Sequence, residues 1–211
     1  MADPAPHTPL RAAPGTTPGT GAAPPADART HRETLGHFAS GVVVVTAHTS
    51  SGPVGFTCQS FASLSLDPPL VSFAVARTSR TWPLIRDTSA FCVNVLAREQ
   101  EALSAAFARS GGDRFRQVSW SPGHRGAPSL DGACAWIGCD LLHEYEGGDH
   151  TIAVGRVASL RADPGREPLV FHRGRYRTLA QPDGRRQDGA EPAPDRGTAT
   201  GPSSHPAPRH V

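Results

Sequence analysis

The stretch that decides the fold is GFTCQSFASLSLDPP, which occupies residues 55–69. It stands between two apolar runs, at residues 42–47 and 70–76, and it is rich in small hydroxyl and amide side chains. β-Branched apolar runs bounded by Gly, Pro and Ser are typical of strands. We therefore expect a polar turn between two strands, at a place where backbone N–H groups can meet a flat, hydrogen-bonding ligand.

The composition predicts one domain between two tails. Only 37% of the 211 residues are apolar, which is low for a fully packed chain of this length. Residues 1–30 and 180–211 are rich in Ala, Pro, Gly, Thr and Arg and show no hydrophobic periodicity. Such segments bury too little apolar surface to offset the entropy lost on ordering. We expect disordered tails at residues 1–30 and 180–211 around a domain at residues 31–179.

Charge and hydropathy argue against two classes of partner. The formal net charge is +2, and every basic side chain apart from His is an Arg, which does not favour a strong field for nucleic acid. The sequence has no secretion signal at its N-terminus and no apolar run long enough to span a bilayer. We expect a soluble, cytoplasmic protein with neither a nucleic-acid nor a membrane partner.

The four cysteines do not form the C-x-x-C pairs that mark zinc or redox sites. They occur at Cys58, Cys92, Cys134 and Cys139. Because free Cys is among the most buried residue types, we expect four reduced thiols buried in apolar strands.

Apolar runs and turn residues predict the order of elements. Strands are expected at residues 42–47, from 54, and at 70–76, 91–96, 133–145, 151–160, 169–172 and 176–179. Turns are expected at residues 50–53 and 146–150, and a long irregular connection at residues 111–129. Hairpin connections without β-α-β alternation favour a mainly β fold, an antiparallel barrel with short helices on its outside.

Three short helices are expected. One, at about residues 27–40, has Leu35, Phe38 and Ala39 on its apolar side. Another, at residues 99–109, has Leu103, Ala106 and Phe107 on its apolar side.

The third helix carries Trp82 and Ile85, with Thr78 or Ser79 as its N-cap. Its first turn is either an ordinary capped helix start or a phosphate site, because free N–H groups there attract small anions.

Familiar catalytic motifs are missing from the sequence. It contains no phosphate loop of the G-x-x-x-x-G-K-[ST] type, no H-E-x-x-H zinc helix and no G-x-S-x-G elbow. His143 and Glu144 are consecutive in an expected strand and point to opposite faces, so we expect no metal site there. His150 stands at a hairpin end beside two glycines, and as a lone loop His it is either exposed and idle or functional.

Seven motifs stand in an order that resembles the flavin reductase-like family, the reductase components of two-component flavin-dependent monooxygenases. They are GFTCQSF at 55–61, SLDPPLV at 65–71, SRTW at 79–82, FCVNVL at 91–96, DRF at 113–115, GDH at 148–150 and FHRGRY at 171–176. The resemblance covers the chain from about residue 31 to residue 179. Each motif alone is weak, but their common order and spacing are highly specific.

The resemblance implies a split β-barrel of Greek-key type that forms a homodimer and binds FMN or FAD at the dimer interface. NADH or NADPH reduces this flavin, which then diffuses to a separate monooxygenase. Carried over residue by residue, the flavin ring is lined by Thr57, Cys58, Gln59 and Ser60. Ser65 and Leu66 follow along the flavin. Its phosphate is held by Ser79, Arg80 and Thr81, beside the cofactor-binding Trp82.

The resemblance also places His150 at the nicotinamide site, with Phe115 and Tyr176 as further candidates to border the pocket. Hydride transfer from a dihydronicotinamide to a flavin requires two closely stacked rings but no acid, base or nucleophile from the protein. The absence of a catalytic triad is compatible with that reaction.

Other functions stay open at this point. A protein of the same fold could use a bound flavin on its own substrate, or could bind flavin without catalysis. A small barrel that binds single-stranded nucleic acid would need a basic groove with stacking aromatics, and aromatic residues are only 6% of this chain.

Overall fold

The computed structural model describes residues 27–109, 111 and 114–179. Apart from residues 27–30, the predicted tails lie outside these residues, as do Gly112 and Asp113, and the tail prediction stays a prediction. Residues 27–30 belong to a helix start, where the Asp27 carboxylate accepts hydrogen bonds from Arg29 N and Thr30 N. No helix in the described part of the chain is long and apolar enough to cross a membrane.

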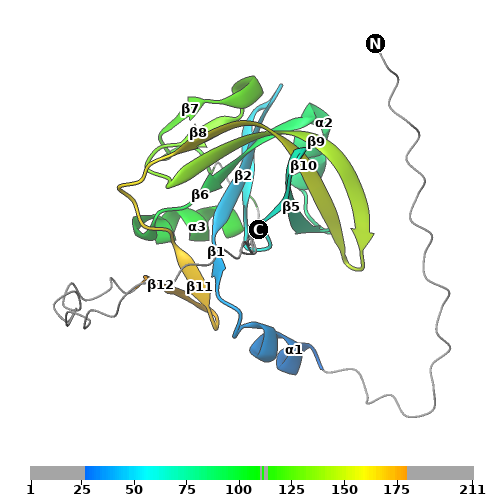
Figure 1. Ribbon diagram of the computed structural model, residues 1–211, viewed down its shortest axis with the longest axis vertical. Coiled ribbons are helices and arrows are strands. Elements are labelled where there is room, and N and C mark those ends of the chain that lie inside the picture. Colours follow the sequence, from blue (N-terminus) through cyan, green and yellow to red (C-terminus); the bar gives the residue numbers. More distant parts are fainter. Residues whose placement is uncertain (1–26, 110, 112–113, 180–211) are drawn as a thin grey trace, which may run out of the picture. The chain divides into compact units, whose positions relative to one another are not determined.

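Seven antiparallel strands form the main sheet (Figure 1). In spatial order they are β3 (Gly52–Cys58), β2 (Val43–Thr49), β6 (Ala90–Val95), β9 (Ala135–Gly147), β10 (His150–Ala162), β5 (Pro69–Ala76) and β4 (Ala62–Leu66). The Ser60 hydroxyl, just after β3, accepts a hydrogen bond from Ala74 N and donates one to Ala74 O in β5. This contact joins the first strand of the order to the sixth. The prediction of a mainly β, antiparallel fold with few short helices is confirmed.

Two smaller sheets flank the main one. β1 (Ser40–Gly41), β11 (Val170–His172) and β12 (Arg175–Arg177) form the first of them. β7 (Trp120–Pro122) and β8 (Pro128–Leu130) form the second, with the 3-10 helix η2 (His124–Gly126) between them. The prediction of an irregular connection is therefore wrong for its last part, where Gly126 at a φ of 78° lets the chain turn back into a hairpin.

β2 is buried on both faces, as its continuous β-branched run predicts. Val43 and Val45 pack into one apolar cluster with Phe91 of the neighbouring strand β6 and Phe73 of β5, which is farther along the sheet. Val42, just before the strand, and its neighbour Val44 pack into a second cluster with Phe107, Leu130 and Leu169. β2 therefore forms the wall between two cores.

Two helices pack against the sheet, α2 (Trp82–Thr88) and α3 (Glu101–Ala108), the latter preceded by the 3-10 helix η1 (Arg98–Gln100). Phe107 of α3 is buried and Leu103 is partly buried, but Ala106 is exposed, so its predicted place on the apolar side is wrong. Ser104 takes that place, because its hydroxyl shares a hydrogen bond of 2.9 Å with the Tyr176 hydroxyl.

The first helix, α1 (Ala28–Leu35), is shorter than predicted, and none of its residues is buried. It ends at Leu35 because Gly36 follows as its C-cap. Leu35 is 58% exposed and Phe38 is 82% exposed. The predicted apolar side is therefore wrong, because Phe38 and Ala39 lie beyond the end of the helix. Among the described residues, Leu35 and Phe38 remain exposed apolar side chains.

The stretch at residues 55–69 is not one polar turn, so that prediction is wrong. Gly55 to Cys58 complete β3, and the alternating residues 62–66 form β4, which pairs with β5 across a turn that contains a cis Asp67–Pro68 peptide. Leu64 and Leu66 remain 49% and 76% exposed. The strand was missed because its apolar side chains are few and face outward.

All four cysteines are free thiols, and the burial prediction is confirmed for three of them, Cys58, Cys92 and Cys139, each of which lies in a strand. Cys134 is only partly buried and precedes β9.

Candidate functional site

A cleft of about 510 Å³ opens where the end of β3 meets the end of β5. It is lined by Phe56, Thr57, Cys58, Gln59, Ser60, Ala74, Val75, Ala76, Ser79, Ala108 and His150. These residues come from β3 and its extension, from β5, from the turn before α2, from the last residue of α3 and from the first residue of β10. Six residues that the sequence singles out are brought together here: Thr57, Cys58, Gln59, Ser60, Ser79 and His150.

Strand register explains why His150 reaches this cleft. In the β5–β10 pair, His150 stands opposite Ala76, and Arg77 N donates a hydrogen bond of 3.0 Å to Asp149 O. The chain then turns, and Ser79 N donates to Ala76 O at 2.8 Å. The turn before α2 and the start of β10 therefore lie together, although they are far apart in the sequence.

The hydroxyl groups of the β3 wall are already engaged inside the protein. Thr57 Oγ1 donates a hydrogen bond of 2.7 Å to Ser104 O of α3. Ser60 Oγ both donates to and accepts from Ala74, at 2.9 and 2.8 Å. These side chains hold the wall in place, so a ligand meets its backbone groups and the exposed Gln59 side chain.

Cys58 is a packing residue in this wall. Its sulfur lies 3.2 Å from Ser60 Oγ and belongs to the larger apolar cluster. Burial raises the pKa of the Cys58 thiol, against smaller opposing contributions from hydrogen bonds with Ser60. The thiol is therefore protonated at neutral pH and is a poor nucleophile.

His150 is oriented by its neighbour Asp149. The distance from His150 Nδ1 to Asp149 Oδ1 is 2.7 Å, and this hydrogen bond is the main cause that lowers the pKa of Asp149. An ionised carboxylate has no proton to donate, so Nδ1 carries the hydrogen and Nε2 is the nitrogen that can meet a ligand.

The turn before α2 differs from its prediction. The helix begins at Trp82, and the N-cap position is Thr81, so the N-cap prediction of Thr78 or Ser79 is wrong. Ser79 nevertheless supplies part of a cap, because its hydroxyl accepts a hydrogen bond from Trp82 N at 3.1 Å. Arg80 is exposed, and Thr81 is partly buried.

Comparison with known proteins decides the family. The model of the flavin reductase like domain matches residues 35–180. The chain belongs to this family. It is 45% identical over 168 residues to the reductase subunit HsaB of a flavin-dependent monooxygenase from Rhodococcus jostii. The aligned region covers 80% of this chain and 86% of that protein.

Solved structures of flavin reductases have the same fold. The crystal structure of nitrilotriacetate monooxygenase component B from Mycobacterium thermoresistibile matches with a TM-score of 0.71 and 42% identity, over 77% of this chain and 94% of that chain. The NADH:FAD oxidoreductase SgcE6 of Streptomyces globisporus, in complex with NAD and FAD fragments, matches with a TM-score of 0.71 and 40% identity, over 77% and 98% of the two chains.

Several residues carried over from the flavin reductase-like family do not line the cleft. Trp82 is only 5% exposed and packs in the core, where its indole Nε1 donates a hydrogen bond of 2.8 Å to Glu144. Ser65 and Leu66 lie on β4, and Arg80 and Thr81 flank the cleft beside Ser79.

Phe115 and Tyr176 also lie away from the cleft. Phe115 contacts Phe107 edge to face, with ring centroids 5.0 Å apart. Tyr176 packs against Phe171 and shares the Ser104 hydrogen bond. Both residues belong to the second apolar cluster, so within one chain they support the elements around the cleft instead of bordering it.

Two further residues shape this site, and sequence reasoning assigned neither of them a role. Asp149 fixes the His150 ring, and its signal was the acidic neighbour in GDH. Arg114 bonds to segments on three sides of the cleft, and its signal was the DRF motif.

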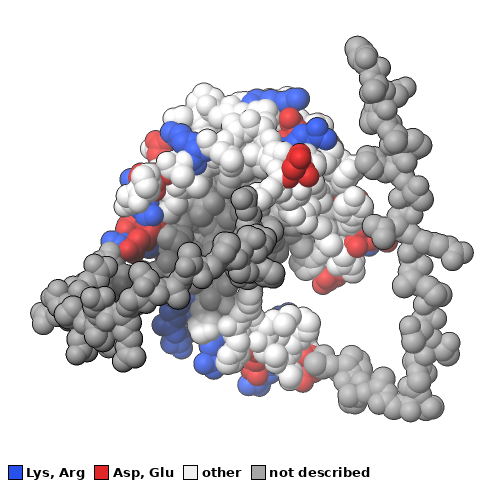
Figure 2. Space-filling view, in the orientation of Figure 1, with Lys and Arg blue, Asp and Glu red and all other residues white. Residues whose placement is uncertain are grey.

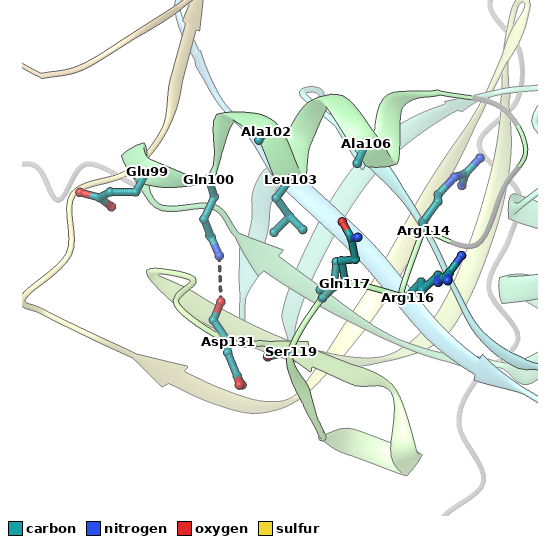
Figure 3. Close-up of a pocket in the computed structure, with 11 residues that line it drawn as sticks. Glu99, Gln100, Ala102, Leu103, Ala106, Arg114, Arg116, Gln117, Ser119 and Asp131 are labelled. Carbon is teal, nitrogen blue, oxygen red and sulfur yellow. Dashed lines mark hydrogen bonds between the residues drawn. The ribbon is translucent and has the colours of Figure 1, made fainter.

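A second cavity, of about 550 Å³, lies between α3 and the segment that follows it (Figure 3). Its lining includes Leu103, Ala106, Arg116 and Gln117, and Gln100 at its rim donates a hydrogen bond of 2.8 Å to Asp131 O. None of the residues predicted for flavin or nicotinamide lines it. Arg114 also lines it, so this cavity adjoins the segments that Arg114 bonds beside the cleft.

Proposed function

We propose that this protein is an NAD(P)H-dependent flavin reductase of the cytoplasm, which reduces FMN or FAD and supplies the reduced flavin to a separate monooxygenase. The observation that carries this proposal is the cleft, which gathers residues 57–60, Ser79 and His150 from three parts of the chain. Membership of the flavin reductase-like family supports the same reaction. Named relatives include an FMN reductase (NADH) and an NADH:FAD oxidoreductase.

The lining of the cleft fits a flavin. A flat ring can lie along the β3 wall, where side-chain hydroxyls are engaged and backbone groups form the surface. We assign the ring to Thr57, Cys58, Gln59 and Ser60. We assign the phosphate to Ser79, Arg80 and Thr81, because Arg80 is an exposed cation beside two hydroxyl side chains.

A bound flavin supplies the hydride acceptor of this reaction. The residues of the chain bind and orient the two rings, since effective concentration and alignment are what such a transfer requires. We assign His150 to the nicotinamide, with Nε2 facing the ligand and Asp149 holding the ring. Cys58 remains a neutral thiol and takes no chemical part.

We further propose that the protein acts as a homodimer whose interface completes the cleft. Support comes from the exposed side chains of Leu35 and Phe38, at and just after the end of α1, and from Leu66 on the outermost strand β4, which is 76% exposed. Exposed apolar groups of this size favour an interface. Ser65 and Leu66 would then approach the flavin from the rim of the cleft.

Among the described residues that can be seen in Figure 2, the Arg side chains form no continuous basic track. Figure 2 shows Arg side chains interspersed with Asp and Glu. A strand of nucleic acid would require one continuous basic track.

The test is oxidation of NADH and NADPH by the purified full-length protein, followed by absorbance, with and without added FMN or FAD. Oxidation should depend on flavin and should saturate with flavin concentration. Oxidation that does not depend on added or bound flavin would exclude the reductase proposal. Gel filtration after the reaction should remove flavin from the protein, because a reductase that serves a separate oxygenase must release its product.

A further inference from the structure

Arg114 joins three segments of the chain through one side chain. Its Nη1 donates hydrogen bonds to Gly55 O and, at 3.3 Å, to Thr81 Oγ1. Its Nη2 donates to Arg109 O. The planar guanidinium fork can serve several acceptors in fixed directions, which a single ammonium group cannot do as well.

Each of the three acceptors lies within two residues of a residue that lines the cleft. Gly55 precedes Phe56 in β3, and Arg109 follows Ala108 at the end of α3. Thr81 lies two residues beyond Ser79 in the turn before α2. Arg114 therefore holds β3, α3 and this turn at fixed mutual positions, although it does not line the cleft itself.

The Gly55 contact fixes an edge of the sheet. β3 is the first strand of the main sheet and pairs with β2 on one side. Gly55 is buried, and a Cβ at this position would lie 3.0 Å from both Phe107 and Val45 O. The backbone here has no room to shift inward, so the outer contact with Arg114 sets how the strand enters the cleft.

One nitrogen of Arg114 is buried without a hydrogen-bond partner, which argues that Arg114 does more than stabilise the fold. Among the residues that the structure describes, Arg114 Nε is the buried side-chain nitrogen that has no hydrogen-bond partner. A buried donor without a partner is unfavourable, although the Arg114 side chain as a whole is only partly buried. Retention of the cation is better explained by the geometry that it imposes.

We infer that Arg114 is a positioning residue for the flavin, which keeps the β3 wall, the turn at Ser79 and the end of α3 in register with one another. The inference rests on the proposed function. Figure 3 shows Arg114 beyond the end of α3 that carries Ala106, on the segment that leads to Arg116. Arg116 carries the same charge but is exposed, so it offers a matched control.

The experiment compares Arg114→Met, Arg114→Lys and Arg116→Met in the full-length protein. Flavin affinity is measured by quenching of flavin fluorescence, and the KM for flavin, the KM for NADH, kcat and the melting temperature are measured in parallel. Arg114→Met should raise the Kd and the KM for flavin about tenfold, as the loss of charge-assisted hydrogen bonds predicts. The KM for NADH should stay within about twofold, because His150 is held by Asp149 and not by Arg114. Arg116→Met should match the wild type.

Arg114→Lys keeps the charge but not the fork, and it should give an intermediate flavin affinity at a melting temperature close to that of the wild type. If Arg114→Met does not fold, Arg114→Lys decides the question, because wild-type flavin affinity in Arg114→Lys would overturn the inference. Equal effects of Arg114→Met and Arg116→Met would also overturn it. A wild-type protein that binds flavin but does not oxidise NADH would remove the proposed function and leave the binding comparison valid.

Discussion

At the scale of single residues, His150 is the group whose role can be tested most directly. Its Nδ1 is held by Asp149, and its ring borders the cleft. We expect His150→Ala to raise the KM for NAD(P)H up to about tenfold, the equivalent of one lost hydrogen bond, and to change the KM for flavin less. Steady-state kinetics with each substrate varied in turn measures this difference.

His143→Ala is a suitable control for this substitution. His143 is an exposed histidine of the neighbouring strand β9, and its ring lies against Tyr145. Its removal should leave both KM values at the wild-type level. An unchanged dependence on nicotinamide in His150→Ala would take His150 out of the site.

The buried thiols make stability depend on pH above neutrality. Burial raises the pKa of Cys92 to about 11 and that of Cys139 to about 12. In the unfolded chain these thiols lose their protons near pH 9, so the unfolded state binds fewer protons than the folded state above that pH. Stability from this source is therefore complete below pH 9 and is lost progressively as pH rises toward 11 to 12.

Urea unfolding at pH 8 and at pH 10.5 should show a lower midpoint at the higher pH. A Cys92→Ala, Cys139→Ala double variant should show a smaller decrease between the two pH values, even though its midpoint at pH 8 is lower. Equal decreases in the wild type and the double variant would contradict the assignment of this pH dependence to the thiols.

Sequence reasoning located much of the cleft but not the partners of its side chains. Residues 57–60, Ser79 and His150 were found because the motifs stand in a recognisable order. The sequence could not show that Thr57 donates to Ser104 or that Ser60 bonds to Ala74, since these partners lie 47 and 14 residues away. In the single chain Trp82 lies in the first apolar cluster, and Phe115 and Tyr176 pack against the second, so their assignment to the ligand stays a prediction.

At the scale of elements, Asn94 connects β6 to the adjacent strand β2 and to β8 of a smaller sheet. Its Nδ2 donates hydrogen bonds to Val44 O and Thr46 Oγ1, at 3.0 and 3.1 Å, and its Oδ1 accepts one from Leu130 N at 2.7 Å. Asn94 is fully buried. Asn94→Leu should lower the free energy of unfolding by about 3 kcal/mol, because it leaves several buried polar groups without partners.

Chemical denaturation measures this loss. Ser129→Ala provides a control in the same region, because Ser129 is buried beside Asn94's strand but its nearest side-chain partner, Cys92 Sγ, is 3.9 Å away. Its cost should be about 1 kcal/mol or less. If Asn94→Leu lowers the free energy of unfolding no more than Ser129→Ala does, the hydrogen bonds of Asn94 to β2 and β8 contribute little to stability.

Elements differ in how well periodicity predicts them. β2 was found because its apolar run is buried on both sides, and β4 was missed because it is an edge strand with outward-facing leucines. The apolar side predicted for the first helix is wrong, because α1 ends at Leu35 and Phe38 lies beyond it. Periodicity identified Leu35 and Phe38 as apolar residues, but it did not show where the helix ends.

At the scale of the whole molecule, the exposed side chains of Leu35 and Phe38 lead to a prediction about assembly. If Leu35 and Phe38 pack against a second copy, the full-length protein should be a dimer by size-exclusion chromatography with light scattering. Phe38→Asp should shift it toward the monomer, because burying a carboxylate in an apolar interface is strongly unfavourable. Leu84→Asp, which alters an exposed leucine of α2, should remain dimeric.

Assembly and flavin binding should then change together. Ser65 and Leu66 on β4 do not line the cleft of one chain, and in the proposed dimer a second copy would bring further groups to the flavin. Phe38→Asp should therefore weaken flavin binding although Phe38 lies outside the cleft, and higher protein concentration should restore part of the affinity by mass action. A monomeric wild type, or a monomeric variant with unchanged flavin affinity, would contradict the proposal that the interface completes the site.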